Sequence, residues 1–383
     1  MQKQIYNVFM PSRVLITVSN DIATDSRVLR FAGILADGGD HVLISGRRLK
    51  GSLPVDHLPY KCRRFNMLFK RSFMFYASLN IRLFFFLLFS KFDILVSVDL
   101  DTLPAGYLVS LIKSKKLVFD SHEYFTGVPE LRERKFVRGF WKSIERIILP
   151  QLSYIITVND SISELYRGEY GSECVVIRNV SERYVGPVMA REMIGASDDE
   201  LLLVLQGRGL NMGNGGEPLI EAIRDIDRVR LMIIGGGDRL KKLKVMAEKD
   251  TLKSKIIFFP VMSWERMMSY TAAADVGVAM FEPGCTNLDL CLPNKLFEYI
   301  GAGLAVLANE LKEISLVLNK YDCGVAVEYP DRKNIAEALL FLRDNPDRLK
   351  EMKRNSLTAF GDLNWKKESA KLKSLISLVK DRT

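Results

Sequence analysis

The residues best suited to bind a diphosphate and a ribose lie together in the C-terminal half of the chain. Pro293 is predicted to lie in the first turn of a helix, because an apolar run with helical spacing follows it, and Asn294 and Lys295 are then at the helix N-terminus. The free N–H groups and the dipole of a helix N-terminus favour an anion, and a lysine there adds positive charge. Glu298 follows one turn later, where its carboxylate could accept two ribose hydroxyls. The alternative is an ordinary exposed helical glutamate.

Two glycine-rich segments follow predicted strands in the same half. They are residues 206–217 (QGRGLNMGNGGE) and residues 235–238 (GGGD). Glycines let the backbone approach a ligand closely, and the planar guanidinium of Arg208 could bind a diphosphate through two parallel hydrogen bonds. Flexible or tight turns would explain the glycines equally well.

Two polar segments in the N-terminal half also follow predicted strands. Residues 19–27 (SNDIATDSR) would begin a helix, whose N-terminus could meet an anion or be capped by Asp25 or Ser26. His122 lies among acidic residues in the sequence Asp-Ser-His-Glu at 120–123. A histidine beside carboxylates could donate to a sugar hydroxyl or a phosphate, although a single histidine is more often structural.

Other cofactor classes are poorly supported by the residues present. The five cysteines form no C-x-x-C pair and there are three histidines, so a zinc site of the usual spacing is not expected. No G-x-G-x-x-G occurs, which weighs against a dinucleotide enzyme. The N-terminal segment MQKQIYNVFMPSR lacks the apolar stretch of a signal peptide, which predicts a cytoplasmic protein with reduced thiols.

The elements that must position these residues are strands alternating with helices. This order predicts an α/β protein with parallel sheets covered on both faces, whose ligands bind beyond the carboxyl ends of the strands. Twelve strands are natural for two sheets, and 383 residues suit two domains. The predicted strands are 14–18, 41–45, 93–98, 117–120, 154–158, 175–177, 201–205, 230–234, 255–259, 276–279, 304–308 and 324–327.

The domain boundary is predicted near Gly186 and Pro187, which break the pattern. We therefore expect two doubly wound, Rossmann-like domains at residues 1–183 and 184–364. The remaining residues, 365–383, have helical spacing and are expected to pack back toward the first domain.

The charge is distributed unevenly between the halves. Residues 1–183 hold 26 Lys and Arg against 18 Asp and Glu, whereas the remainder holds 29 against 28. This surplus suggests that the first half faces an anionic surface, nucleic acid or lipid headgroups, unless it is simply a solvated basic face.

Residues 73–92 (FMFYASLNIRLFFFLLFSKF) are almost long enough to span a bilayer, but they contain Arg82 and Lys91. They are interpreted as a helix that packs on the sheet, either with one face exposed to lipid or as an ordinary buried helix. A membrane-surface role would suit the basic residues just before this segment. These are Lys61, Arg63, Arg64, Lys70 and Arg71.

Three motifs in this order resemble a known family. They are N-D-x-x-x-D-x-R-V at residues 20–28, D-S-H-E at 120–123 and L-P-N-K-L-F-E-Y at 292–299. The chain is similar over nearly its whole length to retaining glycosyltransferases of family 4, bacterial surface-polysaccharide type. The resemblance implies the GT-B fold, in which two Rossmann-like domains face a central cleft.

The resemblance also implies the reaction and its substrates. A sugar would move with retained configuration from a nucleotide-diphosphate sugar, bound mainly by the C-terminal half, to a glycan acceptor on the N-terminal half. We expect no metal and no cofactor besides this co-substrate. The acceptor is expected to be lipid-linked, in capsule or lipopolysaccharide synthesis, with the protein peripheral at the inner face of the cytoplasmic membrane. An anionic membrane surface is an expected partner and nucleic acid is not.

Roles carried over by position divide into three sets. Arg208 would contact the donor diphosphate, Lys295 would lie near the phosphates and His122 near the transferred sugar, and these three form the predicted catalytic set. The predicted donor-binding residues are Asn214, Gly235, Gly236, Gly237, Glu282, Asn294 and Glu298. The predicted acceptor-side residues are Asn20, Asp21 and Glu123.

The chain departs from the family at two positions. Asn214 stands where a second basic residue is usual, and Leu290 stands where a first glutamate precedes Glu298 by eight positions. These departures keep open a second reading, a catalytically silent GT-B subunit that binds a sugar nucleotide or a partner enzyme. A sugar-nucleotide 2-epimerase of the same fold is a third reading, though more acidic and histidine residues would be expected in its cleft.

Overall fold

The computed structural model describes residues 11–70, 72–207, 209–210, 215–249 and 251–381. The chain divides into two compact units. The first comprises Met1–Arg178 and Glu368–Thr383, and the second comprises Asn179–Lys367. The first division lies slightly before the predicted boundary at residue 183, and the second slightly after residue 364.

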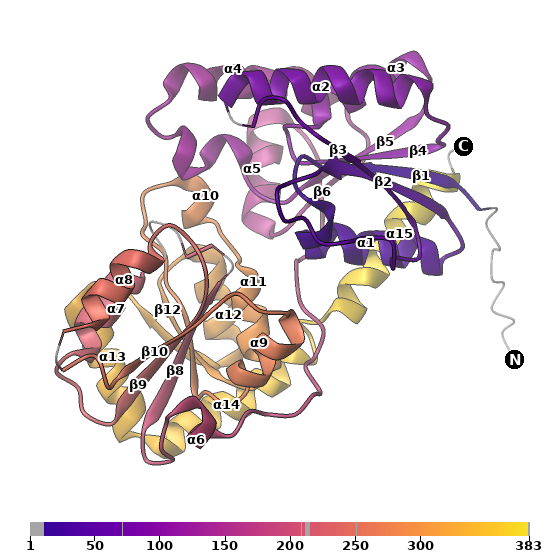
Figure 1. Ribbon diagram of the computed structural model, residues 1–383. Coiled ribbons are helices and arrows are strands. Elements are labelled where there is room, and N and C mark those ends of the chain that lie inside the picture. The colour runs from indigo at the N-terminus through magenta and orange to yellow at the C-terminus, as the bar shows by residue number, and fades with distance from the viewer. Residues whose placement is uncertain (1–10, 71, 208, 211–214, 250, 382–383) are drawn as a thin grey trace, which may run out of the picture. The chain divides into compact units, whose positions relative to one another are not determined.

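The first unit is built on a seven-stranded sheet of order β3-β2-β1-β4-β5-β6-β7 (Figure 1). Each neighbouring pair is parallel. The strand order reverses between β1 and β4, so the loops that follow these two strands flank a switch point, where ligands bind in such sheets. The strands are β1 (Arg13–Thr17), β2 (His41–Arg47), β3 (Lys61–Phe65), β4 (Ile94–Val98), β5 (Lys116–Ser121), β6 (Ile155–Thr157) and β7 (Val175–Val176).

Strand β3 was not predicted, although its residues were noted as a basic run. It reads KCRRF and pairs with β2 at the edge of the sheet. Charged side chains on an edge strand discourage pairing with other chains, and they remove the apolar signal by which strands are recognised.

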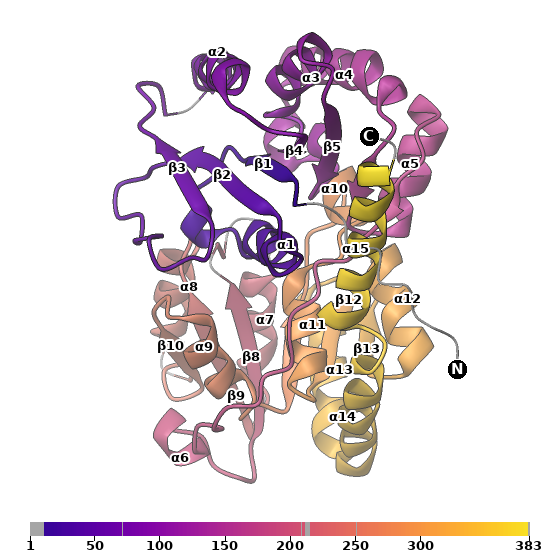
Figure 2. The same ribbon diagram turned by 90° about the vertical axis from the view of Figure 1, so that its right-hand side faces the viewer.

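Helices cover both faces of this sheet. Figures 1 and 2 show α2, α3 and α4 on one face and α1 with α15 on the other. The helices are α1 (Ser26–Asp37), α2 (Ser72–Phe89), α3 (Leu103–Ile112), α4 (Lys135–Ile148), α5 (Asp160–Tyr170) and α15 (Trp365–Asp381), with short 3-10 turns η1 (Ile22–Thr24), η2 (Phe125–Gly127), η3 (Pro129–Leu131) and η4 (Leu149–Gln151).

Helix α15 is bound to the first unit by polar contacts along its length. The Glu368 carboxylate accepts a hydrogen bond from the backbone N–H of Arg178 at 2.9 Å. Near the end of the helix, Lys380 Nζ lies 2.6 Å from Asp40 Oδ1, and both side chains are largely buried. The C-terminal residues of the chain therefore complete the unit in which the chain begins.

The second unit has a six-stranded parallel sheet of order β10-β9-β8-β11-β12-β13. Its strand order reverses between β8 and β11. The strands are β8 (Leu201–Gly207), β9 (Val229–Gly235), β10 (Ile256–Phe259), β11 (Val276–Ala279), β12 (Ala305–Asn309) and β13 (Gly324–Val327). The helices are α6 (Arg191–Ile194), α7 (Gly216–Ile223), α8 (Leu240–Ala247), α9 (Trp264–Thr271), α10 (Thr286–Asp289), α11 (Asn294–Gly301), α12 (Lys312–Tyr321), α13 (Arg332–Asp344) and α14 (Pro346–Phe360).

Both sheets have the doubly wound, parallel arrangement that the sequence predicts. Their central strands are mostly apolar because helices cover both faces, as in β4, where all five residues are buried. The polar residues that could do chemistry therefore lie at the strand ends and in the loops that follow them.

Candidate functional site

In the second unit, helix α11 begins at Asn294 and Pro293 is its N-cap residue. Pro293 therefore lies one position before the first turn in which it was predicted. Asn294 is exposed and Lys295 is half-buried. Both lie in the first turn, where the backbone N–H groups have no partner within the helix.

The ammonium group of Lys295 is buried without compensation. Its Nζ has no hydrogen-bond partner among the described residues. It lies 5.3 Å from the centre of the Phe281 ring. Burial lowers the pKa of Lys295 to about 8, although Cys291 and the Glu298 carboxylate act in the opposite direction. A buried, unpaired ammonium is unfavourable, so an anion at this place would be stabilised.

The Glu298 carboxylate is held in a fixed orientation one turn later. Gln206 Nε2 donates to Glu298 Oε2 at 2.6 Å, and the Trp264 indole N–H donates to Oε1 at 3.1 Å. The Gln206 side chain is itself fixed, because its Oε1 accepts from Thr271 Oγ1 at 2.5 Å. Glu298 is thus an oriented, half-buried acceptor, and the alternative of an ordinary exposed glutamate is wrong.

These contacts leave the Glu298 carboxylate able to bind hydroxyl groups. A carboxylate has about four lone-pair directions, and these two donors use two of them. The partners Gln206 and Trp264 were not assigned a role from sequence. The sequence did contain a signal for a functional role of Gln206, because it is a polar residue near the end of the otherwise apolar strand β8.

The glycines after β9 have a clear packing role. Gly235 and Gly237 have φ of 143° and 126°, and a Cβ on Gly235 would lie 1.8 Å from the carbonyl oxygen of Gly207. The Leu210 N–H donates to the Gly236 carbonyl at 2.7 Å. The loops after β8 and β9 therefore interlock through their backbones, which supports the tight-turn explanation.

The positions of the other predicted donor-side residues say little about their roles. Glu282 is exposed in the loop after β11, and Leu290 is half-buried at the C-terminal end of α10. Arg208 and Asn214 lie outside the described residues.

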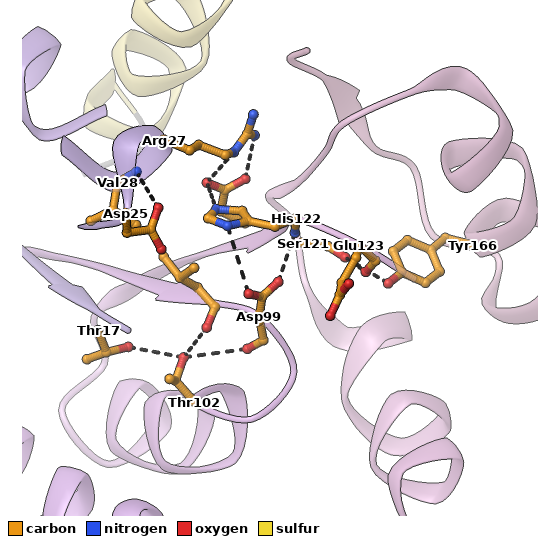
Figure 3. A network of polar contacts seen from close by, with 12 residues as sticks. Thr17, Asp25, Arg27, Val28, Asp99, Thr102, Ser121, His122, Glu123 and Tyr166 are labelled. Atoms are coloured by element: carbon orange, nitrogen blue, oxygen red, sulfur yellow. Dashed lines mark hydrogen bonds and ion pairs between the residues drawn. The ribbon is translucent and has the colours of Figure 1, made fainter. Parts of the chain in front are cut away.

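In the first unit, His122 lies between two carboxylates at the ends of β4 and β5 (Figure 3). Its Nε2 is 3.0 Å from Asp120 Oδ2, and its Nδ1 is 3.8 Å from Asp99 Oδ2. Its backbone N–H donates to Asp99 Oδ1 at 2.9 Å. Burial lowers the pKa of His122, but Asp99 and Asp120 outweigh it and raise the pKa to about 9. The imidazole is therefore a cation at neutral pH, suited to donate a proton in a hydrogen bond.

A buried ion pair joins the first two sequence motifs. Arg27 donates to both oxygens of Asp120, at 3.2 Å from Nε and 2.7 Å from Nη2, and both side chains are almost fully buried. Burial raises the pKa of Asp120, but Arg27 and His122 together hold it well below its usual range. Arg27, in the first turn of α1, thus fixes the carboxylate that holds His122.

The remaining polar residues of these motifs have mainly structural contacts. Asp25 caps α1 by accepting from the Val28 N–H at 3.1 Å, so the capping explanation is correct for this residue. Asp21 is buried and caps η1, accepting from the Ala23 N–H at 3.3 Å. Among the other predicted acceptor-side residues, Asn20 is exposed and Glu123 is half-buried.

Sequence reasoning missed two acidic residues beside His122. Asp99 has a left-handed backbone, with φ of 58°, and burial raises its pKa to about 7. Burial likewise raises the pKa of Asp101 to about 6, and Asp101 Oδ1 is buried without a hydrogen-bond partner among the described residues. The signal was available: the polar sequence Asp-Leu-Asp follows the buried strand β4, at the switch point of the sheet.

The described residues include no group of three or more His, Cys, Asp or Glu placed to hold a metal ion. Their five cysteines form no disulfide.

Part of the second unit is similar to a known family. Residues 191–358 match the model of glycosyl transferases group 1. A lipopolysaccharide core biosynthesis glycosyltransferase, LpsD of Rhizobium meliloti, is 25% identical over 174 residues, which cover 45% of this chain and 47% of that protein. The chain thus spans about half the length of this relative.

Solved structures share the architecture across the chain. Sucrose-phosphate synthase from Thermosynechococcus elongatus matches with a TM-score of 0.82 and 15% identity, covering 97% of this chain and 100% of that one. HepE from Anabaena in complex with UDP-glucose matches with a TM-score of 0.76 and 13% identity, covering 96% and 99%. With the two parallel-sheet units, these similarities show that the fold is GT-B.

Proposed function

We propose that this chain, whose residues 191–358 form a group 1 glycosyltransferase domain on a GT-B fold, is a retaining glycosyltransferase of family 4. It would transfer a sugar from a nucleotide-diphosphate sugar to a glycan acceptor without a metal ion. The observation that carries the proposal is that α11 holds both groups: the buried ammonium of Lys295, which has no hydrogen-bond partner among the described residues, and the oriented carboxylate of Glu298.

The two side chains suit different parts of one donor. The N-terminus of α11 and Lys295 would bind the diphosphate, whose negative charge grows as the glycosidic bond breaks. Glu298, one turn along the same helix, would accept the ribose hydroxyls. The likeness to HepE, solved with UDP-glucose, supports a nucleotide sugar as the donor.

His122 is proposed to act on the transferred sugar. As a cation between Asp99 and Asp120, its imidazole can donate to a sugar hydroxyl at the switch point of the first sheet. The nearby carboxylates of Asp99 and Asp101 are acceptors suited to the hydroxyls of a glycan. We add both to the acceptor-side candidates Asn20, Asp21 and Glu123.

The biological setting is also part of the proposal. The similarity to a lipopolysaccharide core glycosyltransferase supports a lipid-linked acceptor in cell-surface polysaccharide synthesis. The protein would then work at the inner face of the cytoplasmic membrane.

A donor-hydrolysis screen tests the reaction. Purified protein is incubated with UDP-, GDP- and ADP-sugars, with and without EDTA, and the released nucleotide is measured. Slow release from one donor that survives EDTA is expected, and Lys295→Met should abolish it while Lys241→Met, a change of an exposed lysine on α8, should not. Release that needs a divalent ion would contradict the metal-independent mechanism.

A catalytically silent subunit is the second candidate, favoured by Leu290 at a position where the family has a glutamate. It predicts that nucleotide binds but that no donor is turned over, even when lipid-linked acceptors are added. Turnover of any donor would exclude it.

A further inference from the structure

Helix α2 has an apolar side that the protein does not cover. Of the helices in the described residues, it alone is long and apolar enough to cross a membrane, with 18 residues and a mean hydropathy of 1.6, yet 22% of it is buried. The buried stripe recurs every fourth residue from Phe75 to Leu87. The exposed stripe is offset by two positions, at Phe73, Ile81, Phe85 and Phe89, and therefore lies on the opposite side of the helix.

Helices α3 and α4 extend this uncovered side. Asn80 of α2 accepts from the Ala105 N–H of α3 at 3.1 Å, and the Phe73 ring of α2 lies 6.3 Å from that of Phe140 on α4. The three helices lie along one face of the sheet in Figures 1 and 2. Leu111 and Ile112 of α3 are 58% and 61% exposed.

Helix α4 buries Trp141 and Ile148, as a surface helix does, but it also buries a charged side chain and exposes large apolar ones. Its inward side carries Glu145, which is 1% exposed and accepts from Tyr170 at 2.6 Å, and Lys142, which donates to the same hydroxyl at 2.8 Å. Its outward side carries Phe136 and Ile147, which are 90% and 62% exposed. Apolar side chains this exposed are unfavourable in water, so the outward side of α4 is suited to an apolar environment.

The charges on these helices are of one sign. Within the residues of α2, α3 and α4 the only acidic side chain is the buried Glu145. The exposed basic residues are Arg82, Lys135, Arg138 and Arg146, whereas Lys142 lies on the inward side. An apolar surface with cations and no exposed anion matches an anionic bilayer, whose headgroups meet the cations while its acyl region meets the aromatic rings.

We propose that the outer side of α2, α3 and α4, here called the three-helix face, docks on the surface of an anionic bilayer. Phe89, Leu111, Phe136 and Ile147 would enter the boundary between headgroups and acyl chains. Helix α2 would lie on the membrane rather than span it, because its buried stripe packs in the core of the first unit. This inference rests on the three-helix face alone and does not require the proposed catalytic function.

Vesicle co-sedimentation of the full chain tests the docking. The protein is mixed with phosphatidylcholine vesicles, or with vesicles half of phosphatidylglycerol, at low salt and at high salt. We expect it to pellet with the anionic vesicles and less so at high salt. Failure to pellet with anionic vesicles at low salt would overturn the proposal.

Matched variants locate the contact. Phe89→Ser, Phe136→Ser and Ile147→Ser together should weaken vesicle binding at least tenfold, whereas the control Val185→Ser, Met193→Ser and Val245→Ser, also exposed apolar residues but in the second unit, should leave it unchanged. Lys135→Glu with Arg138→Glu should weaken it about tenfold or more, since each basic residue near the surface contributes about 1 kcal/mol. The control Lys241→Glu with Lys249→Glu should not.

Further measurements distinguish membrane docking from misfolding, from dimer formation and from loss of catalysis. Far-UV circular dichroism with thermal unfolding confirms that each variant is folded. Light scattering without vesicles shows whether the three-helix face pairs with a second copy, and a dimer abolished by the apolar triple variant would overturn the membrane assignment. Donor hydrolysis without acceptor is measured in parallel, so loss of vesicle binding and loss of catalysis are distinguishable.

Discussion

Lys295 and His122 are both cations at neutral pH, but their surroundings act on them in opposite ways. Lys295 is buried without a hydrogen-bond partner among the described residues, and its pKa falls to about 8. His122 lies between two carboxylates, and its pKa rises to about 9. The first residue would gain from a ligand's negative charge, whereas the second is already neutralised by the protein.

The depressed pKa of Lys295 predicts a pH dependence of nucleotide binding. A bound diphosphate should raise this pKa, so the complex takes up a proton, and affinity should fall by up to tenfold per pH unit as pH rises above about 8. Calorimetric titration with UDP at pH 7 and pH 9, in buffers of different ionisation enthalpy, measures both the affinity and the proton uptake. Lys295→Met should bind weakly with no such dependence. Equal affinity of the unmodified protein at both pH values would remove Lys295 from the diphosphate site.

The raised pKa of His122 predicts a pH dependence of stability. A histidine whose folded-state pKa exceeds its unfolded value stabilises the fold fully below the unfolded value, and this contribution is lost as pH rises through about 9. The free energy of unfolding, measured by urea titration at pH 7 and pH 9.5, should therefore fall more in the unmodified protein than in His122→Asn. The difference should amount to a few kcal/mol at most. Parallel curves for the two proteins would contradict the imidazolium assignment.

At the scale of elements, the Arg27–Asp120 ion pair joins helix α1 to strand β5. Neither α1 nor β5 can shift without breaking two charged hydrogen bonds in a place that water does not reach. The same carboxylate contacts His122, so the pair also fixes the position of a candidate catalytic group. The distance between helix and strand is thereby coupled to the geometry of the site.

Removing one partner of this ion pair should destabilise the first unit strongly. Arg27→Ala leaves Asp120 charged and buried, and a loss of about 3–5 kcal/mol in the free energy of unfolding is expected. The control is Arg13→Ala, because Arg13 pairs with Asp93 at the surface and its loss should cost far less. Chemical denaturation of both variants gives the comparison. A similar loss of unfolding free energy in the two variants would show that burial does not determine how much the ion pair contributes to stability.

At the scale of the whole molecule, the chain begins and ends in the same unit. The end of helix α15 buries four apolar side chains together with its ion pair to Asp40. These side chains are Leu372, Leu375, Ile376 and Val379. The stability of the first unit therefore depends on a helix that follows the second unit in the chain.

Truncation after Lys367 should destabilise the first unit selectively. Burial of an aliphatic side chain contributes about 1.5–3 kcal/mol, so the four together give about 6–12 kcal/mol, which is an upper estimate of the loss. Hydrogen exchange read by mass spectrometry should show faster exchange in β1, β2 and α1, while β8 and β9 in the second unit keep their protection. Unchanged protection in α1 would show that α15 is dispensable for the first unit.

The sequence by itself determined the architecture of both sheets and the place of the third motif. Strands such as β4 and β8 are mostly apolar because helices cover both faces, and this pattern depends only on local order along the chain. The start of α11 could also be predicted from local sequence, because Pro293 and the apolar spacing after it mark a helix N-terminus. Such signals need no knowledge of distant residues.

Only the tertiary structure decided which polar side chains meet. The partners of Glu298 come from β8 and α9, and the partner of Arg27 lies 93 positions away along the chain. The edge strand β3 and the outward apolar side of α4 were equally hidden, because each contradicts the usual link between polarity and exposure. Local periodicity indicates which side of a helix or strand faces the core. Contacts between distant segments arise only when the sheet brings the strand ends together.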